Sequence, residues 1–543
     1  MQNNPSYSFY TRCDLIVSHL AYADDCIIFC KGNRNAINNI LEFLASYQRC
    51  SGQKVNKGKS GFICSKNASS DLINNWHAIT HFARVKLPFN YLGCPIFTGN
   101  TRNALFDHVI QKVRAHIGGW EGRLLSKGAK LLLIKHVLSA SPPYAFQVVP
   151  PPKTIIKTLK RLFSKFLWTN GNPKRCLHWA NWDDICFPFS EGGLDIRSLE
   201  DTQIVYECKL WWKFREENSL WSSFIKRKYM KGIHPSRINI PYYSSPGFKR
   251  LIRARNIAES HIKWNIGHGN LSFWFDKWND CNIVNFKPEN ERDRKVNYFF
   301  SIDGSWDKPK FDHLLPADVS KAIMNIPIHD EDKIIWNLST DGCFSFKDTW
   351  NSFRSKRETL QVCNFFWFKN FPFKISFFAW QAVTNRLPAD NVLKKKGFHF
   401  ASKCVWNCKE EESIFHILWS CDYAQAVWKV IFKLFNVNLI NFSYLEDILH
   451  FWNSRVGSSK KGNISSHIAL FTCWNIWKAR NNLRFRDIKD SVKLILSNIK
   501  HNIFLQNAAF PYNSWQLDGL KREYFDSEII GCRLNAVYSG SSG

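Results

Sequence analysis

The sequence has no long apolar run and no sign of a targeting segment at its start. No stretch reaches about 18 consecutive apolar residues, the length that a membrane-spanning helix requires. The first residues also lack a basic segment followed by an apolar core, so no secretory signal peptide is predicted. The 17 cysteines are an odd number and cannot all pair within one chain. We therefore expect a nuclear or cytoplasmic protein, not secreted and not bound to a membrane, in which clustered cysteines bind metal rather than form disulfides.

Acidic residues are scarce relative to basic ones. Lys and Arg total 74 against 45 Asp and Glu, which gives a formal net charge of +29. This excess is spread along the whole chain, and such a distribution suits a long polyanion better than a small acidic ligand. The expected partners are RNA and DNA, and the alternative is a basic surface that binds nothing in particular.

The apolar pattern predicts an α+β, helix-rich chain of several domains, since 543 residues are too many for one compact core. Two short apolar runs around Ala23-Asp24-Asp25 predict a β-hairpin with buried strands and an acidic tip. Helical spacing of apolar residues predicts helices near 37–44, 105–117, 127–140, 155–166 and 468–486, the first ending at Gly52. Residues 175–350, rich in Trp and Gly, are predicted to form short strands, for example in 264–278 and 334–350.

The adjacent pair Asp24 and Asp25 is a candidate catalytic motif. Phosphoryl transfer by a polymerase uses two cations, and carboxylates at a hairpin tip can hold those cations against a primer terminus. The alternative is an ordinary turn, because Asp favours turns for its own hydrogen-bonding reasons.

Three segments in a fixed order resemble the reverse transcriptases of plant LINE-type (non-LTR) retroelements. They are SHLAYADDCIIFCK (18–31), SGQKVNKGKSGFIC (51–64) and LPFNYLGCPI (87–96). Further stretches are similar to later parts of the same family, namely WEGRLLSKGAKLLLIKHVL (120–138), WNIGHGN (264–270), FWFDKW (273–278) and WKARNNLRF (477–485).

This resemblance implies roles for individual residues. Asp24 and Asp25 match the metal ligands of the polymerase, and Lys59 matches a position that assists proton transfer to pyrophosphate. The nucleic-acid-binding residues in the resembling segments are Tyr22, Tyr91 and Gly93. The basic residues Lys54 and Lys57 are candidates on their charge alone, since such residues can contact a phosphate backbone, and the alternative is a solvated basic face. The resemblance also implies a third carboxylate from an upstream strand, whereas Asp14 is the acidic residue before Asp24 and lies on the same hairpin approach. We therefore expect an incomplete polymerase site, with Mg²⁺ bound if another chain or an upstream segment completes it.

A second set of candidate ligands is Cys404-x3-Cys408-x7-His416-x4-Cys421. Three thiolates and one imidazole form a closed tetrahedral set for Zn²⁺, the usual form of a structural site. The alternative is a group of buried thiols beside a hydrogen-bonded histidine.

The segment around these ligands, CVWNCKEEESIFHILWSCDYAQAVW (404–428), resembles the zinc-binding segment of the same reverse transcriptases. That segment begins with Cys-x2-Cys, so this chain has one additional residue between Cys404 and Cys408. Because His416 and Cys421 are five residues apart, a short helix must end or bend between them. The acidic run Glu410-Glu411-Glu412 is expected to be a solvated turn and to supply no metal ligand.

The sequence therefore predicts a retroelement-derived protein that binds nucleic acid and zinc and is not catalytic alone. A competent RNA-directed DNA polymerase completed by a second chain is the alternative, and a relic without a role is a third. The expected domains are a partial palm (1–100), a thumb-like helical region (101–170), a Trp-rich connecting region (171–354), a zinc-binding domain (355–440), a helical segment (441–500) and a tail (501–543).

Overall fold

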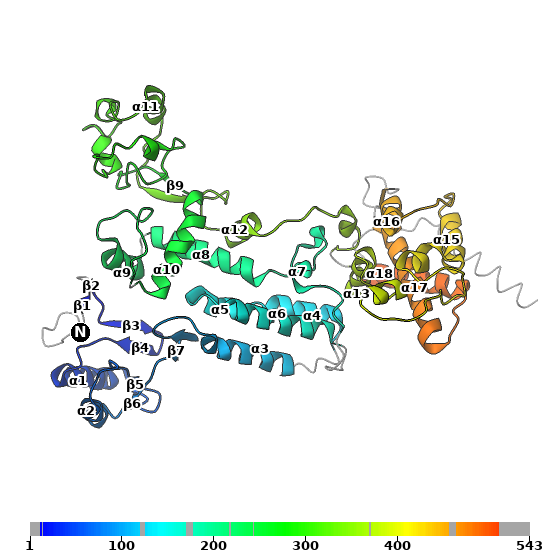
Figure 1. Cartoon of the computed structure of the whole chain (residues 1–543), viewed down its shortest axis with the longest axis horizontal. Coiled ribbons are helices and arrows are strands. Elements are labelled where there is room, and N and C mark those ends of the chain that lie inside the picture. The colour runs from blue at the N-terminus through cyan, green and yellow to red at the C-terminus, as the bar shows by residue number, and fades with distance from the viewer. Residues whose placement is uncertain are drawn as a thin grey trace, which may run out of the picture. The chain divides into compact units, whose positions relative to one another are not determined.

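The computed structural model describes residues 11–12, 15–119, 125–169, 177–216, 219–242, 244–368, 371–454 and 463–509 (Figure 1). Asp14 and most of the expected tail lie outside these described residues. The chain divides into two compact units. Unit 1 comprises residues 1–113, 139–159 and 199–354, and unit 2 comprises residues 114–138, 160–198 and 355–543.

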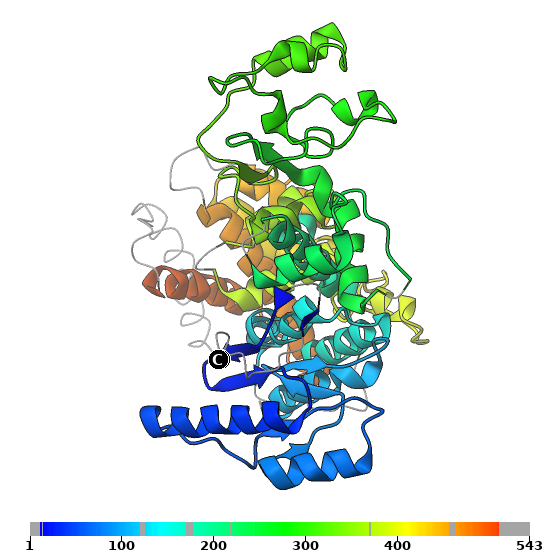
Figure 2. The same ribbon diagram turned by 90° about the vertical axis from the view of Figure 1, so that its left-hand side faces the viewer.

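The strands of the described residues form five small sheets of two strands each, and all of them belong to unit 1. The strands are β1 (Thr11–Arg12), β2 (Leu15–Ile16), β3 (His19–Tyr22), β4 (Asp25–Ile28), β5 (Gly61–Phe62), β6 (Ala83–Arg84), β7 (Phe89–Tyr91), β8 (Cys94–Ile96), β9 (Ile262–Asn265) and β10 (Lys333–Trp336). Strands β5 and β6 are parallel, and the other pairs are antiparallel. The structure is thus helix-rich with small sheets (Figure 2), which confirms the α+β, helix-rich prediction.

Helices are the main secondary structure of both units. Unit 1 contains α1 (Arg34–Ser51), α2 (Ser70–Thr80), α5 (Ser141–Val148), α8 (Leu199–Arg215), α9 (Leu220–Ile225), α10 (Pro246–Ala258), α11 (Ala317–Met324) and α12 (Phe346–Phe353). Unit 2 contains α4 (Lys127–Leu133), α7 (Trp182–Ile185), α13 (Phe373–Val383), α14 (Asp390–Lys395), α15 (Asp422–Leu434), α16 (Leu445–Ser454), α17 (Asn463–Arg486) and α18 (Val492–Ala509). Helices α3 (Asp107–Gly119) and α6 (Lys153–Trp168) include residues of both units.

The helices predicted from apolar spacing are all present. The first, α1, ends at Gly52, whose φ of 73° is the left-handed conformation that glycine adopts without strain. Helix α4 continues into a π-helical turn at Ile134–Leu138, so the helix predicted from residue 127 consists of two pieces. No helix in the described part of the chain combines the length and apolarity that crossing a membrane demands.

The prediction of short strands within residues 175–350 is correct for the two segments given as examples and incomplete for the rest of the range. Strands β9 and β10 pair with each other, and the same range also contains helices α8, α9 and α10, which were not predicted. Helix α8 buries side chains on most sides, including Leu199, Val205, Trp211 and Phe214, and so lacks the single apolar stripe that identifies a surface helix. The periodicity of apolar residues therefore did not predict this helix or its packing against α10.

The prediction of buried strands at the β3–β4 hairpin is also wrong. The pairing itself is as expected, with Tyr22 opposite Asp25 across the turn. The side chains of β3 are all exposed, however, including Leu20 at 42% and Tyr22 at 67%. The physical reason is that this hairpin is a complete two-stranded sheet among the described residues, with no further strand to cover it.

Unit 2 is a helical bundle whose core is rich in Trp. Helix α17 contacts α13, α16 and α18, and α15 contacts α18. Trp380, Trp428 and Trp452 are fully buried in this unit. The Trp380 indole N–H donates to the Gly192 carbonyl at 2.9 Å, which joins α13 to the segment that follows α7. This bundle holds the predicted Cys and His ligands.

Candidate metal centre

Cys404, Cys408, His416 and Cys421 form a compact cluster in unit 2. Their potential ligand atoms all lie within 4.8 Å of one another. The Sγ atom of Cys421 lies 3.7 Å from that of Cys404 and 3.4 Å from that of Cys408. Cys404, His416 and Cys421 are buried, and Cys408 is half-buried. Folding therefore brings together four residues that extend over 18 positions of the sequence.

The additional residue between Cys404 and Cys408 is accommodated by a turn. Asn407 has a φ of 68°, a left-handed conformation that asparagine tolerates better than most residues. Its backbone N–H donates to the Cys404 carbonyl at 2.9 Å, and the Cys404 N–H donates to the Glu410 carbonyl at 3.1 Å. The loop is thus closed at its base, and both sulfur atoms are presented to the same point.

The other two ligands lie on either side of the expected bend. His416 begins a π-helical turn, His416–Ser420, and Cys421 follows it with extended φ and ψ of −66° and 140°. Cys421 is also the residue before the first turn of α15, whose backbone N–H groups at Asp422 and Tyr423 bond the sulfurs of Cys408 and Cys421. Backbone N–H groups at a helix N-terminus stabilise thiolates, the form that binds a metal.

The two ring nitrogens of His416 have different environments. Nδ1 lies 2.7 Å from a carboxylate oxygen of Glu410 and 3.1 Å from the Ser420 hydroxyl. Because a carboxylate can only accept a hydrogen bond, Nδ1 must carry the hydrogen, and the Nδ1–H group donates a hydrogen bond to Glu410. Nε2 is buried and has no hydrogen-bond partner. A buried imidazole nitrogen without a partner, with its opposite N–H bonded to a carboxylate, is the arrangement of a metal-binding histidine.

The protonation of the cluster also fits a metal site. A hydrogen bond from the Cys421 thiol, together with contact with His416, lowers the pKa of Cys404 to about 4 despite burial. The same sharing of protons raises the pKa of Cys421 above its usual range, and burial raises the pKa of Cys408. Contact with the Cys404 sulfur raises the pKa of His416. Without a metal, therefore, the Cys404 thiolate is stabilised by hydrogen bonds from its neighbours. A bound cation would replace the protons of these hydrogen bonds.

The donor set suits zinc. Three sulfurs and one imidazole match the ligands of closed, four-coordinate structural sites, and soft thiolates favour Zn²⁺ over Mg²⁺ or Ca²⁺. A metal held by all four side chains would have no position left for a substrate or a reactive water, so the donor set fits a structural centre rather than a catalytic one.

The expectation of a solvated acidic turn at 410–412 is wrong for Glu412. This side chain is fully buried, and its carboxylate forms an ion pair with the buried guanidinium of Arg480 on α17. Arg480 Nε donates to the second carboxylate oxygen at 3.1 Å, and Arg484 Nη1 donates to the first at 3.0 Å. A charge can be buried where it is paired in this way. Nothing in the spacing of the three glutamates indicated that one of them would reach α17, 68 residues further on.

The same network holds the start of the metal-binding segment. Arg484 also pairs with Asp390 at 2.7 Å, and the Ser402 hydroxyl donates to Asp390 at 2.9 Å. Two arginines of the segment WKARNNLRF, Arg480 and Arg484, therefore support the metal-binding segment. Neither Glu410 nor Glu412 was among the site residues predicted from the sequence.

The candidate polymerase residues are in unit 1. Ala23 and Asp24 form the turn of the β3–β4 hairpin, where Ala23 has a φ of 50°, and Asp25 begins β4. Both aspartates are exposed. Among the described residues, the Cys404–Cys421 cluster is the group of three or more His, Cys, Asp or Glu side chains that could share a metal ion. Asp24 and Asp25 therefore have no third described carboxylate beside them.

The structure places the predicted basic residues Lys54, Lys57 and Lys59 in an exposed loop after α1. The Asn56 side chain accepts from the Lys59 backbone N–H at 3.1 Å, and the Ser60 hydroxyl donates to the Asn56 carbonyl at 2.8 Å. The loop thus has a defined turn that displays the Lys59 side chain to solvent.

Tyr91 and Gly93 belong to a second hairpin, formed by β7 and β8. Leu92 and Gly93 both have positive φ, 49° and 73°, which is the geometry of a tight two-residue hairpin turn. The Tyr144 hydroxyl of α5 donates to the Leu92 carbonyl at 2.7 Å and fixes this turn against unit 1. Tyr22, in contrast, extends freely from its hairpin.

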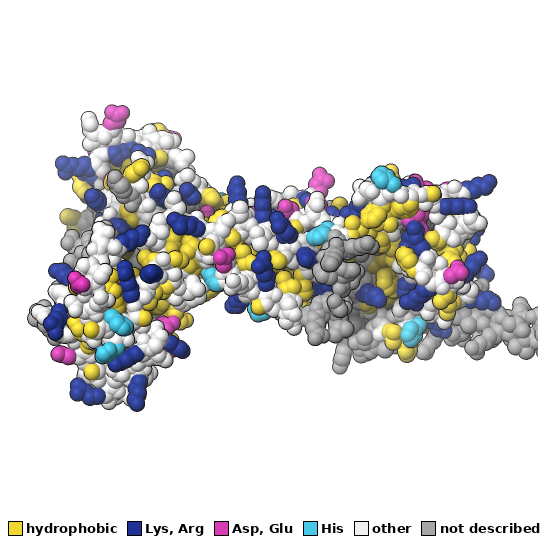
Figure 3. Space-filling model, turned by 60° about the horizontal axis from the view of Figure 1, so that its bottom comes forward, with side chains coloured by type: hydrophobic (Ala, Val, Ile, Leu, Met, Phe, Trp, Pro, Cys, Tyr) yellow, Lys and Arg dark blue, Asp and Glu magenta, His cyan; other side chains and the backbone are white. Residues whose placement is uncertain are grey.

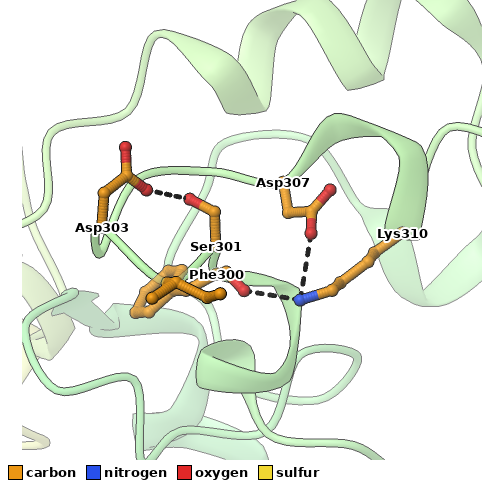
Figure 4. A pocket seen from close by; sticks show the side chains of 6 residues that line it. Phe300, Ser301, Asp303, Asp307 and Lys310 are labelled. Carbon is orange, nitrogen blue, oxygen red and sulfur yellow. Dashed lines mark hydrogen bonds and ion pairs between the residues drawn. The ribbon is translucent and has the colours of Figure 1, made fainter.

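A shallow hollow elsewhere in unit 1 offers no comparable chemistry (Figure 4). Lys310 in this hollow bonds the Asp307 carboxylate at 3.0 Å and the Phe300 carbonyl at 2.6 Å. Asp303 accepts from the hydroxyls of Ser301 and Ser305. Its polar groups are thus already paired with one another.

Comparison with known proteins agrees with the metal centre. Residues 344–428 match the family described as zinc-binding in reverse transcriptase. The chain is 24% identical over 352 residues to an Arabidopsis thaliana protein provisionally named as a ribonuclease H protein, a match that covers 62% of this chain and 57% of that protein. It is 22% identical over 142 residues to an uncharacterized mitochondrial protein of the same plant, covering 26% of this chain and 92% of that protein. The chain thus spans little more than half of the first relative. These matches confirm the resemblance to the C-terminal region of a plant-type reverse transcriptase.

Proposed function

We propose that this reverse-transcriptase-like chain derives from a plant LINE-type retroelement, binds RNA and DNA, and holds one structural Zn²⁺ ion through Cys404, Cys408, His416 and Cys421. The observation that carries the proposal is the buried, unpartnered Nε2 of His416 beside three thiols in a segment that matches a zinc-binding family. The ion would fix the Cys404–Cys408 loop to the start of α15. Its role would be to hold the fold, because the donor set is closed.

Metal analysis of the purified, metal-replete protein tests the zinc proposal. We expect about one zinc ion per chain, and the Cys421→Ser variant should lose it, because three ligands bind zinc far more weakly than four. Cys343→Ser is the matched control, since Cys343 is an exposed free thiol outside the cluster. Wild-type protein without zinc, or an unchanged zinc content in Cys421→Ser, would show that the cluster is not a zinc site.

Residues 1–100 are proposed to be a palm remnant and the helices between 101 and 170 a thumb-like region, and the 543-residue chain is proposed not to be a polymerase by itself. The exposed Asp24 and Asp25, without a third described carboxylate, support this. Two carboxylates on one hairpin cannot surround two cations.

A primer-extension assay on an RNA template with Mg²⁺ or Mn²⁺ tests the absence of polymerase activity. We expect no extension by the purified chain. The proposal fails if extension occurs and is abolished by Asp24→Ala or Asp25→Ala, since that would assign the activity to this hairpin.

The competing function is a polymerase completed by another polypeptide. The exposed apolar side chains of the β3–β4 hairpin, Leu20 and Tyr22, favour it, since an uncovered apolar hairpin invites a partner. The test adds a polypeptide carrying the fingers and first palm strands of a plant LINE-type reverse transcriptase. Extension that appears upon addition and is lost in Asp24→Ala would support this function, and continued inactivity of the mixture would exclude it for that partner.

A further inference from the structure

We propose that the loop of the metal centre carries a binding surface for single-stranded nucleic acid, with Trp406 as a stacking platform and Lys403, Lys409 and Lys489 as phosphate contacts. We call these four residues and Tyr423 the knuckle rim. The inference rests on the proposed zinc and nucleic-acid binding and assigns part of that binding to particular side chains.

Lys403 and Lys409 flank the base of the metal-binding loop. They immediately precede Cys404 and follow Cys408, and the hydrogen bond from the Cys404 N–H to the Glu410 carbonyl at 3.1 Å holds the two chain segments together. Both lysines are exposed, and neither has a carboxylate partner among the described residues. Glu410 and Glu411 do not neutralise them, because these carboxylates pair with His416 and Lys394.

Trp406 stands at the tip of this loop. Its ring stacks on Tyr423 with centroids 4.5 Å apart and an interplanar angle of 11°. The side chain is half-buried, and its indole N–H has no partner in the described structure. Trp380 and Trp428 of the same unit, in contrast, are fully buried and donate to backbone carbonyls. Trp406 is thus a partly exposed aromatic ring that is held in place by its stacking on Tyr423.

Tyr423 connects this loop to a second basic segment. Its hydroxyl donates to the Asp490 carbonyl at 2.7 Å, which fixes the turn between α17 and α18 beside the start of α15. Lys489, next to Asp490, is exposed and has no carboxylate partner among the described residues. Asp422 and Asp487 are exposed acids on these segments, and Asp422 directly precedes Tyr423. The charge of Asp422 should oppose phosphate binding, so removal of this charge offers a gain-of-affinity test.

The combination fits a single strand better than a duplex. An aromatic ring can stack on a base only where the base face is free, and each such contact contributes about 1–3 kcal/mol. The bases of a duplex are already stacked on their neighbours, whereas lysines contact the phosphates of any nucleic acid. Figure 3 shows Lys and Arg side chains spread over the visible surface, so positive charge alone would not distinguish this loop from the rest of the surface. The loop differs because it also carries a partly exposed aromatic ring, Trp406, beside lysines that have no carboxylate partner among the described residues.

The first experiment measures the affinity of zinc-loaded, full-length protein for fluorescent oligonucleotides of about 20 nucleotides, as oligouridine, oligothymidine and a duplex. The Lys403→Gln/Lys409→Gln variant is expected to bind both single strands about tenfold more weakly, with a smaller salt dependence. The control is Lys321→Gln/Lys333→Gln, which removes the same charge from exposed, unpaired lysines of unit 1 and should change affinity less than about twofold.

The second experiment separates stacking from charge. Trp406→Leu should weaken single-strand binding by roughly fivefold to a hundredfold and leave duplex binding nearly unchanged, whereas Trp406→Tyr should retain most of the affinity. Asp422→Asn should bind a few times more tightly, a gain that a misfolded variant cannot show. Zinc content is measured for every variant. If Trp406→Leu loses zinc, its affinity cannot be interpreted, and the affinities of Trp406→Tyr and of Lys403→Gln/Lys409→Gln then test the proposed surface.

The outcomes distinguish this inference from the function on which it rests. Wild-type protein that binds no oligonucleotide would refute the proposed nucleic-acid binding itself. If wild type binds but the knuckle-rim and control lysine variants lose affinity equally, the proposed function stands and this inference is refuted. Equal losses by Trp406→Leu for duplex and single strands would refute the assignment to single strands.

Discussion

The two ring nitrogens of His416 have different roles: Nδ1 fixes the orientation of the ring, and Nε2 is the candidate metal ligand. The bond from Nδ1 to Glu410 fixes the ring orientation and leaves Nε2 facing the thiols. Glu410 is largely exposed, so its contribution to global stability should be small. Its contribution to metal affinity should be larger, because a carboxylate on the distal nitrogen raises the basicity of the ligand.

We predict that Glu410→Gln lowers zinc affinity by about tenfold to a hundredfold, since an amide orients the imidazole less firmly than a carboxylate. Competition with a chromogenic chelator measures this. Glu411→Gln is the matched control, because Glu411 is the next residue, is exposed and pairs with Lys394 rather than with a ligand. Equal affinities for the two variants would mean that Glu410 has no role in orienting His416.

A buried ion pair between Arg480 and Glu412 helps to hold helix α17 against the metal-binding segment. Arg480 and Glu412 are both almost fully buried, and the Arg480 guanidinium also lies 4.9 Å above the Trp477 ring. Such a pair adds little net stability as a unit, but removing one partner leaves a buried charge without a counterion.

We therefore expect Glu412→Gln to destabilise unit 2 locally by about 3–5 kcal/mol. Hydrogen–deuterium exchange of the zinc-loaded chain should show faster exchange in α17 and in the 404–421 segment, by about a hundredfold or more. Glu411→Gln again provides the comparison, with an expected change below about 1 kcal/mol for an exposed pair. Unchanged protection of α17 in Glu412→Gln would contradict the proposed role of the pair.

The WNIGHGN segment has an equally specific structural explanation. The Asp332 carboxylate accepts the backbone N–H groups of Gly267, Gly269 and Asn270 at 2.7, 3.0 and 2.7 Å. A Cβ atom at Gly267 would lie 2.2 Å from a backbone carbon of Glu331, so only glycine allows this close approach. The motif thus fixes a loop to the start of β10.

At the scale of the whole molecule the dominant property is the net charge of +29. Each phosphate that a protein neutralises releases counterions, so affinity for nucleic acid should fall steeply as salt rises. The charge is distributed over both units, which predicts little sequence preference.

We expect affinity for RNA and DNA of mixed sequence to fall by about a hundredfold or more between roughly 50 and 200 mM salt, if several phosphates are contacted. Fluorescence anisotropy across this range measures the slope. Affinity that is independent of salt, or a strong preference for one sequence, would contradict binding through distributed charge.

The sequence by itself determined features that depend on neighbouring residues. Amphipathic helices such as α1, the hairpin at Asp24 and the four potential zinc ligands could be predicted, because each lies within a short segment and its spacing is local. The four potential ligands could be identified without contacts between distant segments, because the bend between His416 and Cys421 is also a local feature.

Only the tertiary structure decided which polar groups are buried and which apolar ones are not. Glu412 was expected in solvent, yet Arg480, 68 positions away, holds it in the core. The strands beside Asp24 were expected in the core, yet no described strand covers them. Helix α8 was missed because its buried positions surround the helix rather than follow one stripe. Burial depends on contacts between segments distant in sequence, and local periodicity carries no information about these contacts.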